Sequence, residues 1–469
     1  MRIVHVALAG GMLAAIAIAA ADNVRASDLS QPYSVRQTAF EYDSYTYFAP
    51  EEEASPSPSD QPAPKVASVD SCYGPMACDP VACDPCGPAA CDSCYQPSCG
   101  NSCGRSCGGG LFGCCLGDAW ELAEPCALSC RGIEWGGWMS AGILANSRGY
   151  DTNGPLGFND RAQFDAHQVW FYLDKGVDTS EYGWDIGGHV DLVFGADGPD
   201  TTAFGDQDWD FDWDTSRDYG WAMPQLYATI GIGDWTVKAG HFYTIIGWEV
   251  VQAPDNFFYS HAYTMYYGEP FTHTGFLAER GIGDRLTVRG GWVTGWDGGF
   301  RNLNGASMFL GGFSYELTDR ATFTYACTAG NFGNGTQSGN VGDLYMHSLV
   351  LEYAVTDRLT YILQHDNGQN WGTGGNDSQW YGINQYLTYQ LNDCWAAGTR
   401  FEWFRDDDGA RVGEVGDYYE VTCGLNYKPH ANLTIRPELR YDWFEGIGTP
   451  YPGNNTDQFS GGLDFIATW

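Results

Sequence analysis

The strongest constraint on the fold is a two-residue alternation of apolar and polar side chains that recurs from residue 133 to the C-terminus. In the segments CWAAGTRFEWF (394–404) and LTIRPELRYDW (433–443), apolar and aromatic residues occupy one set of alternate positions. Charged residues occupy the other set: Arg400, Glu402, Arg436, Glu438, Arg440 and Asp442. Successive side chains of a β-strand point to opposite faces, so the pattern predicts strands with one apolar and one charged face.

Short turn sequences divide this region at regular intervals. Their centres lie 50, 36, 38, 35 and 38 residues apart, and two strand-like runs joined by a longer loop lie between successive turns. The spacing predicts hairpins with tight turns on one side and long loops on the other. The turn sequences are GIGDW (231–235), GIGDRL (281–286), LTDRA (317–321), VTDRL (355–359), QLNDCW (390–395) and YKPHANL (427–433).

Alternation alone fits either a soluble β-sandwich or a membrane-spanning β-barrel. Strands of roughly ten residues, short turns opposite long loops, and aromatic residues near strand ends favour the barrel. The last segment, DQFSGGLDFIATW (457–469), is an amphipathic strand ending in an aromatic residue, which resembles the assembly signal of outer-membrane proteins. We therefore predict an all-β protein with a transmembrane antiparallel β-barrel of about 16 strands, in a range of about 14–18.

The N-terminal part of the chain differs in composition from the alternating region. Residues 1–26 combine an early Arg2 with an apolar run and small residues, which is typical of a secretory signal peptide. Residues 27–71 are rich in Ser, Pro, Asp and Glu and predict a disordered linker. Residues 72–130 hold 13 of the 16 cysteines and predict a cysteine-rich periplasmic segment, which leaves residues 131–469 for the barrel.

The spacing Cys83-x2-Cys86-x4-Cys91-x2-Cys94 has two interpretations. Four thiolates at this spacing can close a zinc tetrahedron. An exported chain favours disulfides, and we prefer that interpretation. Because 13 is odd, at least one cysteine of this segment must stay free, pair with the barrel region or bridge to another molecule. We expect cross-linking to a cell-wall layer, and we predict neither a metal site nor a cofactor.

The net charge of −36 restricts the partners of the protein. Nucleic acid is excluded, because its phosphates require a basic surface. The acidic balance is compatible with cationic solutes or divalent ions. The expected partners are therefore small hydrophilic solutes or ions, outer-membrane lipid, further copies of the chain in a homotrimer, and the cell wall.

Four segments carry a resemblance to a known family: GWEVVQAPDNFFYSHAYTMYYGEPFTHTG (247–275), QWYGINQYLTYQLND (379–393), RFEWFRDDDGARV (400–412) and RPELRYDW (436–443). They resemble the putative OmpL-like beta-barrel porin family, also called beta-barrel porin-2, and the likeness runs from about Trp138 to Trp469. The resemblance implies an outer-membrane channel. It brings no established catalytic residues and no firm substrate, and the cysteine-rich segment lies outside it.

The segment NFFYSHAYTMYYGEPFTHTG (256–275) contains residue types found in active sites. Ser260 and His261 could belong to the catalytic triad of an outer-membrane hydrolase, but the chain has neither a G-x-S-x-G elbow nor an H-E-x-x-H pair. The segment is also the third long loop of the predicted barrel, and in sixteen-stranded porins that loop folds inward and narrows the pore. We predict that loop 246–273 is a constriction and that the protein is not an enzyme.

The predicted constriction residues are Glu249, Asp255, Asn256, His261, Glu269 and His273. We expect Glu249, Asp255 and Glu269 to face inward-pointing arginines across the pore, and the two histidines to hydrogen-bond the loop in place. The predicted pore-lining residues are Lys238, Arg289, Arg400, Glu402, Arg436, Glu438, Arg440 and Asp442. Charged side chains in a narrow pore set its selectivity, although cross-strand ladders that stiffen the wall would use the same residues.

These patterns together predict an outer-membrane porin for passive diffusion of small hydrophilic solutes, with a mild preference for cations. Two alternatives stay open at this point. One is the hydrolase that would use Ser260 and His261, and the other is a structural envelope protein whose barrel anchors a cross-linked N-terminal segment.

Overall fold

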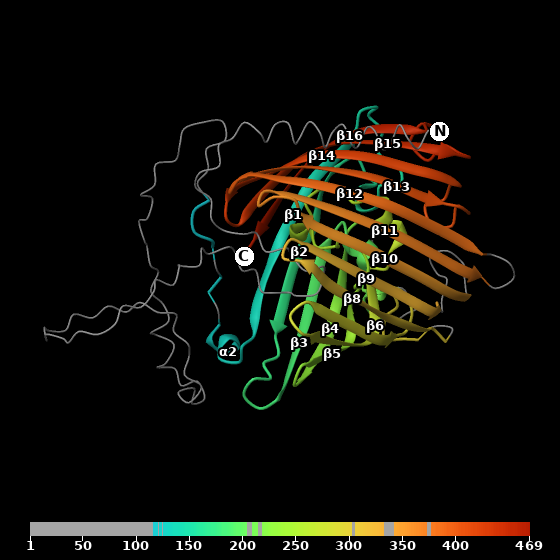
Figure 1. Cartoon of the computed structure of the whole chain (residues 1–469). Helices are drawn as coiled ribbons and strands as arrows, with labels where there is room; N and C mark the ends of the chain where they lie inside the picture. Colours follow the sequence, from blue (N-terminus) through green and yellow to red (C-terminus); the bar gives the residue numbers. More distant parts are fainter. Residues whose placement is uncertain are drawn as a thin grey trace, which may run out of the picture.

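The protein forms a closed antiparallel β-barrel of sixteen strands (Figure 1). The computed structural model describes residues 116–120, 122–123, 125–203, 209–213, 218–302, 305–332, 342–372 and 377–469. Each strand pairs with its neighbours along the chain, and β1 pairs with β16 to close the barrel. The predicted fold class and strand number are confirmed.

Except for β7, which has 8 residues, the strands reach the roughly 9–11 residues that a tilted strand needs to cross a bilayer. Their bounds are β1 (Glu134–Asn146), β2 (Phe164–Lys175), β3 (Trp184–Gly195), β4 (Gly220–Ile232), β5 (Trp235–Tyr243), β6 (Thr272–Ile282), β7 (Leu286–Val293), β8 (Ser307–Thr318), β9 (Ala321–Asn331), β10 (Gly342–Ala354), β11 (Leu359–Gly372), β12 (Ser378–Asn392), β13 (Trp395–Asp406), β14 (Gly416–His430), β15 (Leu433–Gly446) and β16 (Asp457–Thr468). The short turns, such as those that join β4 to β5 and β6 to β7, lie on one side of the barrel, and the long loops lie on the other side.

Helical structure in the described residues is limited to single turns. These are α2 (Cys126–Ser129), α3 (Gly198–Thr201), and the short helices at Gly157–Asn159, Trp209–Asp212, Ala253–Asp255 and Thr264–Gly268. None of the described helices has the length and hydropathy needed to cross a membrane.

The outer and inner faces of the strands differ as the alternation predicts. On β15, Leu439 and Tyr441 are exposed on the outside, whereas Arg440 and Asp442 are buried inside. The closing strand β16 follows the same rule, with Phe459 and Leu463 exposed outside and Asp464 buried inside. An apolar outer face and a polar inner face are the expected division in a membrane barrel.

The short-turn side of the barrel also contacts the end of the cysteine-rich segment. Asn432, in the turn between β14 and β15, accepts a hydrogen bond from Trp120 N at 2.5 Å and donates one to Trp120 O at 3.0 Å. The Trp120 ring lies 4.7 Å from the His430 ring. The proposed signal peptide (1–26), the linker (27–71) and the cysteines Cys83, Cys86, Cys91 and Cys94 lie outside the described residues.

Candidate functional site

The connection between β5 and β6, residues 244–271, lies against the inner wall of the barrel, and we call it the inner loop. Most of its residues are buried, and its helical turn Thr264–Gly268 packs against β11 and β12. Trp380 of β12 donates a hydrogen bond through Nε1 to Gly268 O at 2.9 Å. The inner loop is the third long loop along the chain, as the sequence predicts.

Arg400 of β13 is the centre of the contacts between the inner loop and the wall. Its guanidinium is fully buried and pairs with Glu249 of the inner loop at 2.6 Å (Nη1 to Oε1) and with Glu420 of β14. The same Nη1 donates to Ser260 O at 2.7 Å. Burial alone would raise the pKa of Glu249, but the Arg400 charge outweighs it and holds that pKa below its usual value.

Two arginines of β15 bind the backbone of the inner loop. Arg436 donates through Nη1 to the carbonyls of Ala253, Asn256 and Phe258, at 3.0, 2.7 and 3.1 Å. Arg440 donates through Nη1 to His261 O at 2.6 Å. Arg436 also pairs with Asp464 of β16, and Arg440 pairs with Asp442. Guanidinium groups have five donors in a fixed fork, which suits them to clamping several carbonyls at once.

Two carboxyl groups of the same wall accept hydrogen bonds from loop amides. Glu438 of β15 accepts from Tyr259 N at 2.9 Å and from Ser260 N at 3.2 Å. Glu402 of β13 accepts from Tyr263 N and from Thr264 N, both at 2.6 Å. The inner loop is thus held by side chains that satisfy its buried backbone groups, which would be costly to leave without partners. We call the inner faces of β13–β16 the charged wall.

Glu269 corrects one expectation of the sequence, because its neighbour on the wall is a carboxyl group and not an arginine. Gln364 of β11 donates to Glu269 Oε1, and Asp366 of β11 lies beside it. Burial and then the Asp366 carboxyl raise the pKa of Glu269 well above its usual value. The Glu269 side chain fits here because residue 247 is a glycine. The φ of Gly247 is +95°, and a Cβ on residue 247 would lie 1.9 Å from Glu269 Oε2.

The remaining predicted constriction residues occupy different places. Asn256 holds a loop turn by donating through Nδ2 to Val250 O at 2.6 Å and to Gln252 O at 3.0 Å. His261 Nε2 lies 3.2 Å from Val250 O, and His273 Nδ1 lies 3.0 Å from Gly295 O. Asp255 is exposed, so the structure does not bring it into the buried cluster with the arginines.

Burial of the charged wall is the main difference from the predicted pore lining. The side chains of Arg400, Glu402, Arg436, Glu438, Arg440 and Asp442 point inward as expected, but all six are less than 5 % exposed because the inner loop covers them. Alternation also places Glu420 and Asp464 inward, and sequence reasoning overlooked these two partners. The same period-two pattern that identified the arginines would have found them.

The opposite inner wall, from β5 to β10, has a different character. Eight of its inward side chains, most of them toward the long-loop ends of the strands, are apolar and buried, and they belong to one cluster with Ile245 and Ile246 of the inner loop. The inward Thr328 and Ser348 are buried polar residues of the same side. We call this surface the apolar wall, and its members are Phe242, Leu277, Val293, Met308, Leu310, Ala326, Leu344 and Met346.

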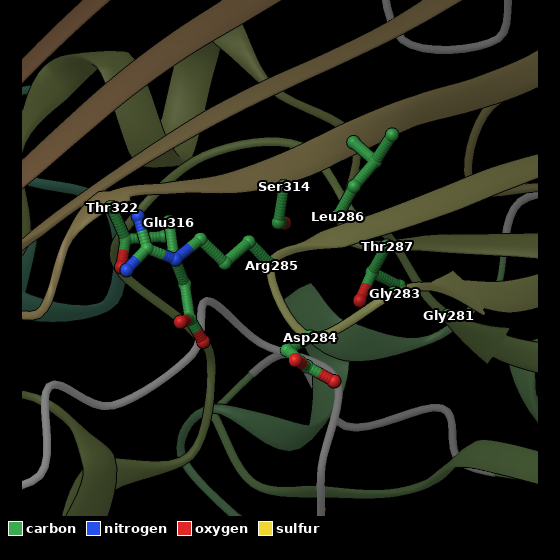
Figure 2. A pocket seen from close by; sticks show the side chains of 9 residues that line it. All are labelled: Gly281, Gly283, Asp284, Arg285, Leu286, Thr287, Ser314, Glu316 and Thr322. Atoms are coloured by element: carbon green, nitrogen blue, oxygen red, sulfur yellow. The ribbon is translucent and has the colours of Figure 1, made fainter.

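Charged groups on this side lie nearer the short turns. Arg289 of β7 pairs with Glu279 of β6 at 2.5 Å, and Lys238 of β5 lies over the Tyr227 ring. A cavity of about 70 Å³ opens beside the turn between β6 and β7 (Figure 2). Arg285, Glu316 and Thr322 are among the side chains that line it.

The geometry does not assemble the site that the alternative hydrolase interpretation would need. The Ser260 hydroxyl accepts hydrogen bonds from Arg400 and Arg440, whereas His261 contacts Val250 and Asn256. No hydrogen bond joins the serine and the histidine in the described part of the chain. A serine nucleophile requires a base within hydrogen-bond reach.

Comparisons with known proteins agree with this architecture. The model of the family described as "Putative beta-barrel porin-2, OmpL-like" matches residues 132–469. The fold is similar to an anion-selective porin from Comamonas acidovorans (TM-score 0.51, 8% identity, covering 72% of this chain and 99% of that one). It is also similar to the outer membrane channel DcaP of Acinetobacter baumannii (TM-score 0.50, 10% identity, covering 72% and 97%). No curated protein matches the chain.

Proposed function

The chain belongs to the putative beta-barrel porin-2, OmpL-like family, and on that premise we propose that it admits small hydrophilic solutes and ions across the outer membrane by passive diffusion. The observation that carries the proposal is the inner loop, which a ladder of arginines and carboxyl groups fixes inside a closed sixteen-stranded barrel. A barrel of this size encloses an aqueous lumen in known porins. A rigid loop inside the lumen would determine which solutes pass.

The path that we propose runs between the inner loop and the β4–β10 side of the barrel. Two observations support this choice. The charged wall is covered by the loop, whereas Lys238 and Glu316 on the other side stay partly exposed near the short turns. The contacts between the loop and the apolar wall are also non-directional, so they can slide or separate more easily than the ion pairs of the charged wall.

Local charge supports the predicted preference for cations. The buried charged groups here are three arginines and six carboxyl groups. The arginines are Arg400, Arg436 and Arg440 of the charged wall, and the carboxyl groups are Glu249 of the inner loop and Glu402, Glu420, Glu438, Asp442 and Asp464 of the charged wall. The loop separates these groups from the proposed path, so their acidic excess would act on cations in the path through the electrostatic field inside the barrel and not by direct contact.

Conductance of the purified protein in planar bilayers tests the proposal. We expect discrete channel openings and, in a salt gradient, a reversal potential of the sign that cation selectivity requires. The absence of channels under voltage and pH conditions that preserve the folded barrel would refute the porin function, and an anion-selective reversal potential would refute the charge argument.

A second candidate is an envelope anchor, and the contact between Trp120 and Asn432 favours it. Short turns of bacterial barrels face the periplasm, so we propose that this contact holds the cysteine-rich segment at the periplasmic rim. A non-reducing gel of native envelopes tests the cross-link to the wall, for which we expect material larger than the monomer. Deletion of residues 72–115 separates the two functions: an anchor predicts envelope defects with unchanged conductance, and a porin without an anchoring role predicts an intact envelope.

The homotrimer is a prediction from the sequence, and it competes with the two-fold pair that is argued below from the outer surface of the barrel. Native mass spectrometry of the protein in lipid nanodiscs would give the number of copies.

A further inference from the structure

The outer surface of the barrel is apolar at mid-depth on most strands. On β15 the outward residues include Leu439 and Tyr441, and on β16 they include Phe459, Leu463 and Phe465. On β3, outward Ile186 is exposed, and Val190 and Leu192 are partly exposed. Such faces suit the hydrocarbon core of a bilayer.

Three adjacent strands break this rule. The outward positions of β10, β11 and β12, which lie side by side (Figure 1), include two imidazoles and three amides at mid-strand. We call these residues the outer patch: His347, His365, Asn367, Gln369 and Gln385, all partly exposed. On β11 the polar run lies between outward Tyr361 and Trp371 near the strand ends, so it falls inside the band that aromatic girdles enclose.

Contact with lipid hydrocarbon is unfavourable for the polar groups of the outer patch. An amide or imidazole that faces hydrocarbon loses its hydrogen bonds to water and gains none. The His347 and His365 rings stack on each other at 5.7 Å. Tyr361 Oη donates to Gln385 Oε1 at 2.8 Å, which orients that amide with its nitrogen as the remaining donor. Another protein surface with polar groups at the same depth would satisfy this patch.

We propose that the outer patch is the contact surface for a second copy of this chain, related to the first by a two-fold axis along the membrane normal. Two copies in one membrane have the same depth, so a patch at mid-depth meets the same patch of its neighbour. A two-fold interface must be self-complementary. Amides and neutral imidazoles meet this condition because each both donates and accepts hydrogen bonds, and the five residues include no Asp, Glu, Lys or Arg.

A three-fold ring would place the patch against a different face of the neighbouring barrel. The outer faces of β3, β15 and β16 offer no matching amide or imidazole at mid-depth. Of the faces compared, the patch itself is therefore the one that offers its polar groups partners, and a two-fold pair brings the patch against itself. This inference rests on the membrane-spanning barrel alone and does not depend on whether the barrel conducts.

Photo-cross-linking of the full chain in outer membranes tests the proposal. Asn367 is replaced by the photoreactive amino acid p-benzoylphenylalanine, with outward Leu463 of β16 replaced in the same way as the matched control. We expect a product of twice the chain mass at position 367, joined to a residue of β10, β11 or β12 of the other copy, and no such product at position 463. Adducts to lipid alone, to another protein, or to any other strand of a second copy would overturn it.

A second variant addresses the energetic origin of the contact. We replace the polar run of β11 with leucine (His365→Leu, Asn367→Leu, Gln369→Leu) and compare it with the control Met139→Leu, Ile143→Leu on the outer face of β1. The patch variant should lower the dimer-to-monomer ratio in nanodiscs at least about tenfold, which is about 1.4 kcal/mol. The control should leave it unchanged. Both should keep the heat-modifiable gel mobility of a folded barrel, and an unchanged ratio in a folded patch variant would contradict the proposal.

Discussion

The charged wall and the apolar wall hold the inner loop by different kinds of interaction. On the charged wall, each arginine or carboxyl group contacts a specific backbone group or carboxylate of the inner loop, as Arg400 does with Glu249 and Ser260. On the apolar wall, Ile245 and Ile246 pack in a cluster without directional bonds. The first kind of contact fixes position, and the second supplies burial without fixing register.

This difference has a consequence for the channel. On the apolar side the loop is hydrogen-bonded only near its ends, where Phe271 N donates to Asp297 Oδ1 at 2.6 Å and Thr244 Oγ1 lies 3.0 Å from His273 Nε2. Between those ends the loop should separate from the apolar wall before it separates from the charged wall, because fewer directional bonds have to break there. We therefore expect the width of the path to depend on the apolar wall and the position of the loop to depend on the charged wall. The predictions that follow test this division, beginning with the largest effect.

Arg400→Met should have the largest effect. It leaves Glu249 buried without its cation and Glu420 with only the longer pair to Arg440 at 3.9 Å. Removal of one partner from a buried ion pair typically costs about 3–5 kcal/mol. The inner loop should detach from the charged wall, so single-channel conductance should rise and the temperature at which the barrel unfolds on gels should fall. Planar-bilayer recordings and heat-modifiable mobility measure both.

A matched control is Arg320→Met at the exposed turn between β8 and β9, where the arginine pairs with Asp357 in solvent. Exposed pairs contribute little, so both readouts should stay near wild type. Adding Glu249→Gln and Glu420→Gln to Arg400→Met should recover part of the lost stability, because the uncompensated charges are gone. If conductance and stability of Arg400→Met match those of the control, the charged wall does not hold the loop.

The sequence anticipated the barrel far better than the loop contacts. Alternation and turn spacing are local properties of each strand, so they predicted the strand number and the inward direction of Arg436 and Arg440. The partners of the inner loop depend on how residues about 140–180 positions apart meet in space, as with Tyr263 and Glu402. Periodicity carries no information on such contacts, and for this reason Glu269 was expected to face an arginine when it lies beside Asp366.

Ile246→Val tests the apolar wall and should have an intermediate effect. Removal of one buried methylene from a packed core typically costs about 0.5–1.5 kcal/mol. The ion pairs of the charged wall should keep the loop in register, so the barrel should be slightly less stable while ion selectivity is unchanged. Reversal potentials and unfolding in urea measure the two effects, and a selectivity change as large as that of Arg400→Met would show that the two walls do not divide their roles in this way.

Glu269→Gln should have the smallest effect of these substitutions. At low pH it should change neither stability nor conductance, and the variant should differ from the wild type only as pH rises. Because the folded pKa of Glu269 is raised, the protonated form is favoured by folding: its contribution to stability is complete below the usual value of 4.5 and is lost as pH rises through the folded pKa. Above that pKa, the ionised group would face Asp366 and weaken the contact of the loop with β11.

A glutamine cannot ionise, and its amide has nearly the shape of the protonated acid. Below pH 4.5 the variant and the wild type should therefore have similar conductance and stability, and as pH rises through the folded pKa the wild type alone should show a loosened loop and larger current fluctuations. Equal pH dependence in the two proteins would assign the titration to another group. Glu269 joins the inner loop to β11, which lies between the charged wall and the apolar wall, so a loop that loosens here without losing its Arg400 contacts would pivot on the charged wall and open toward the apolar one.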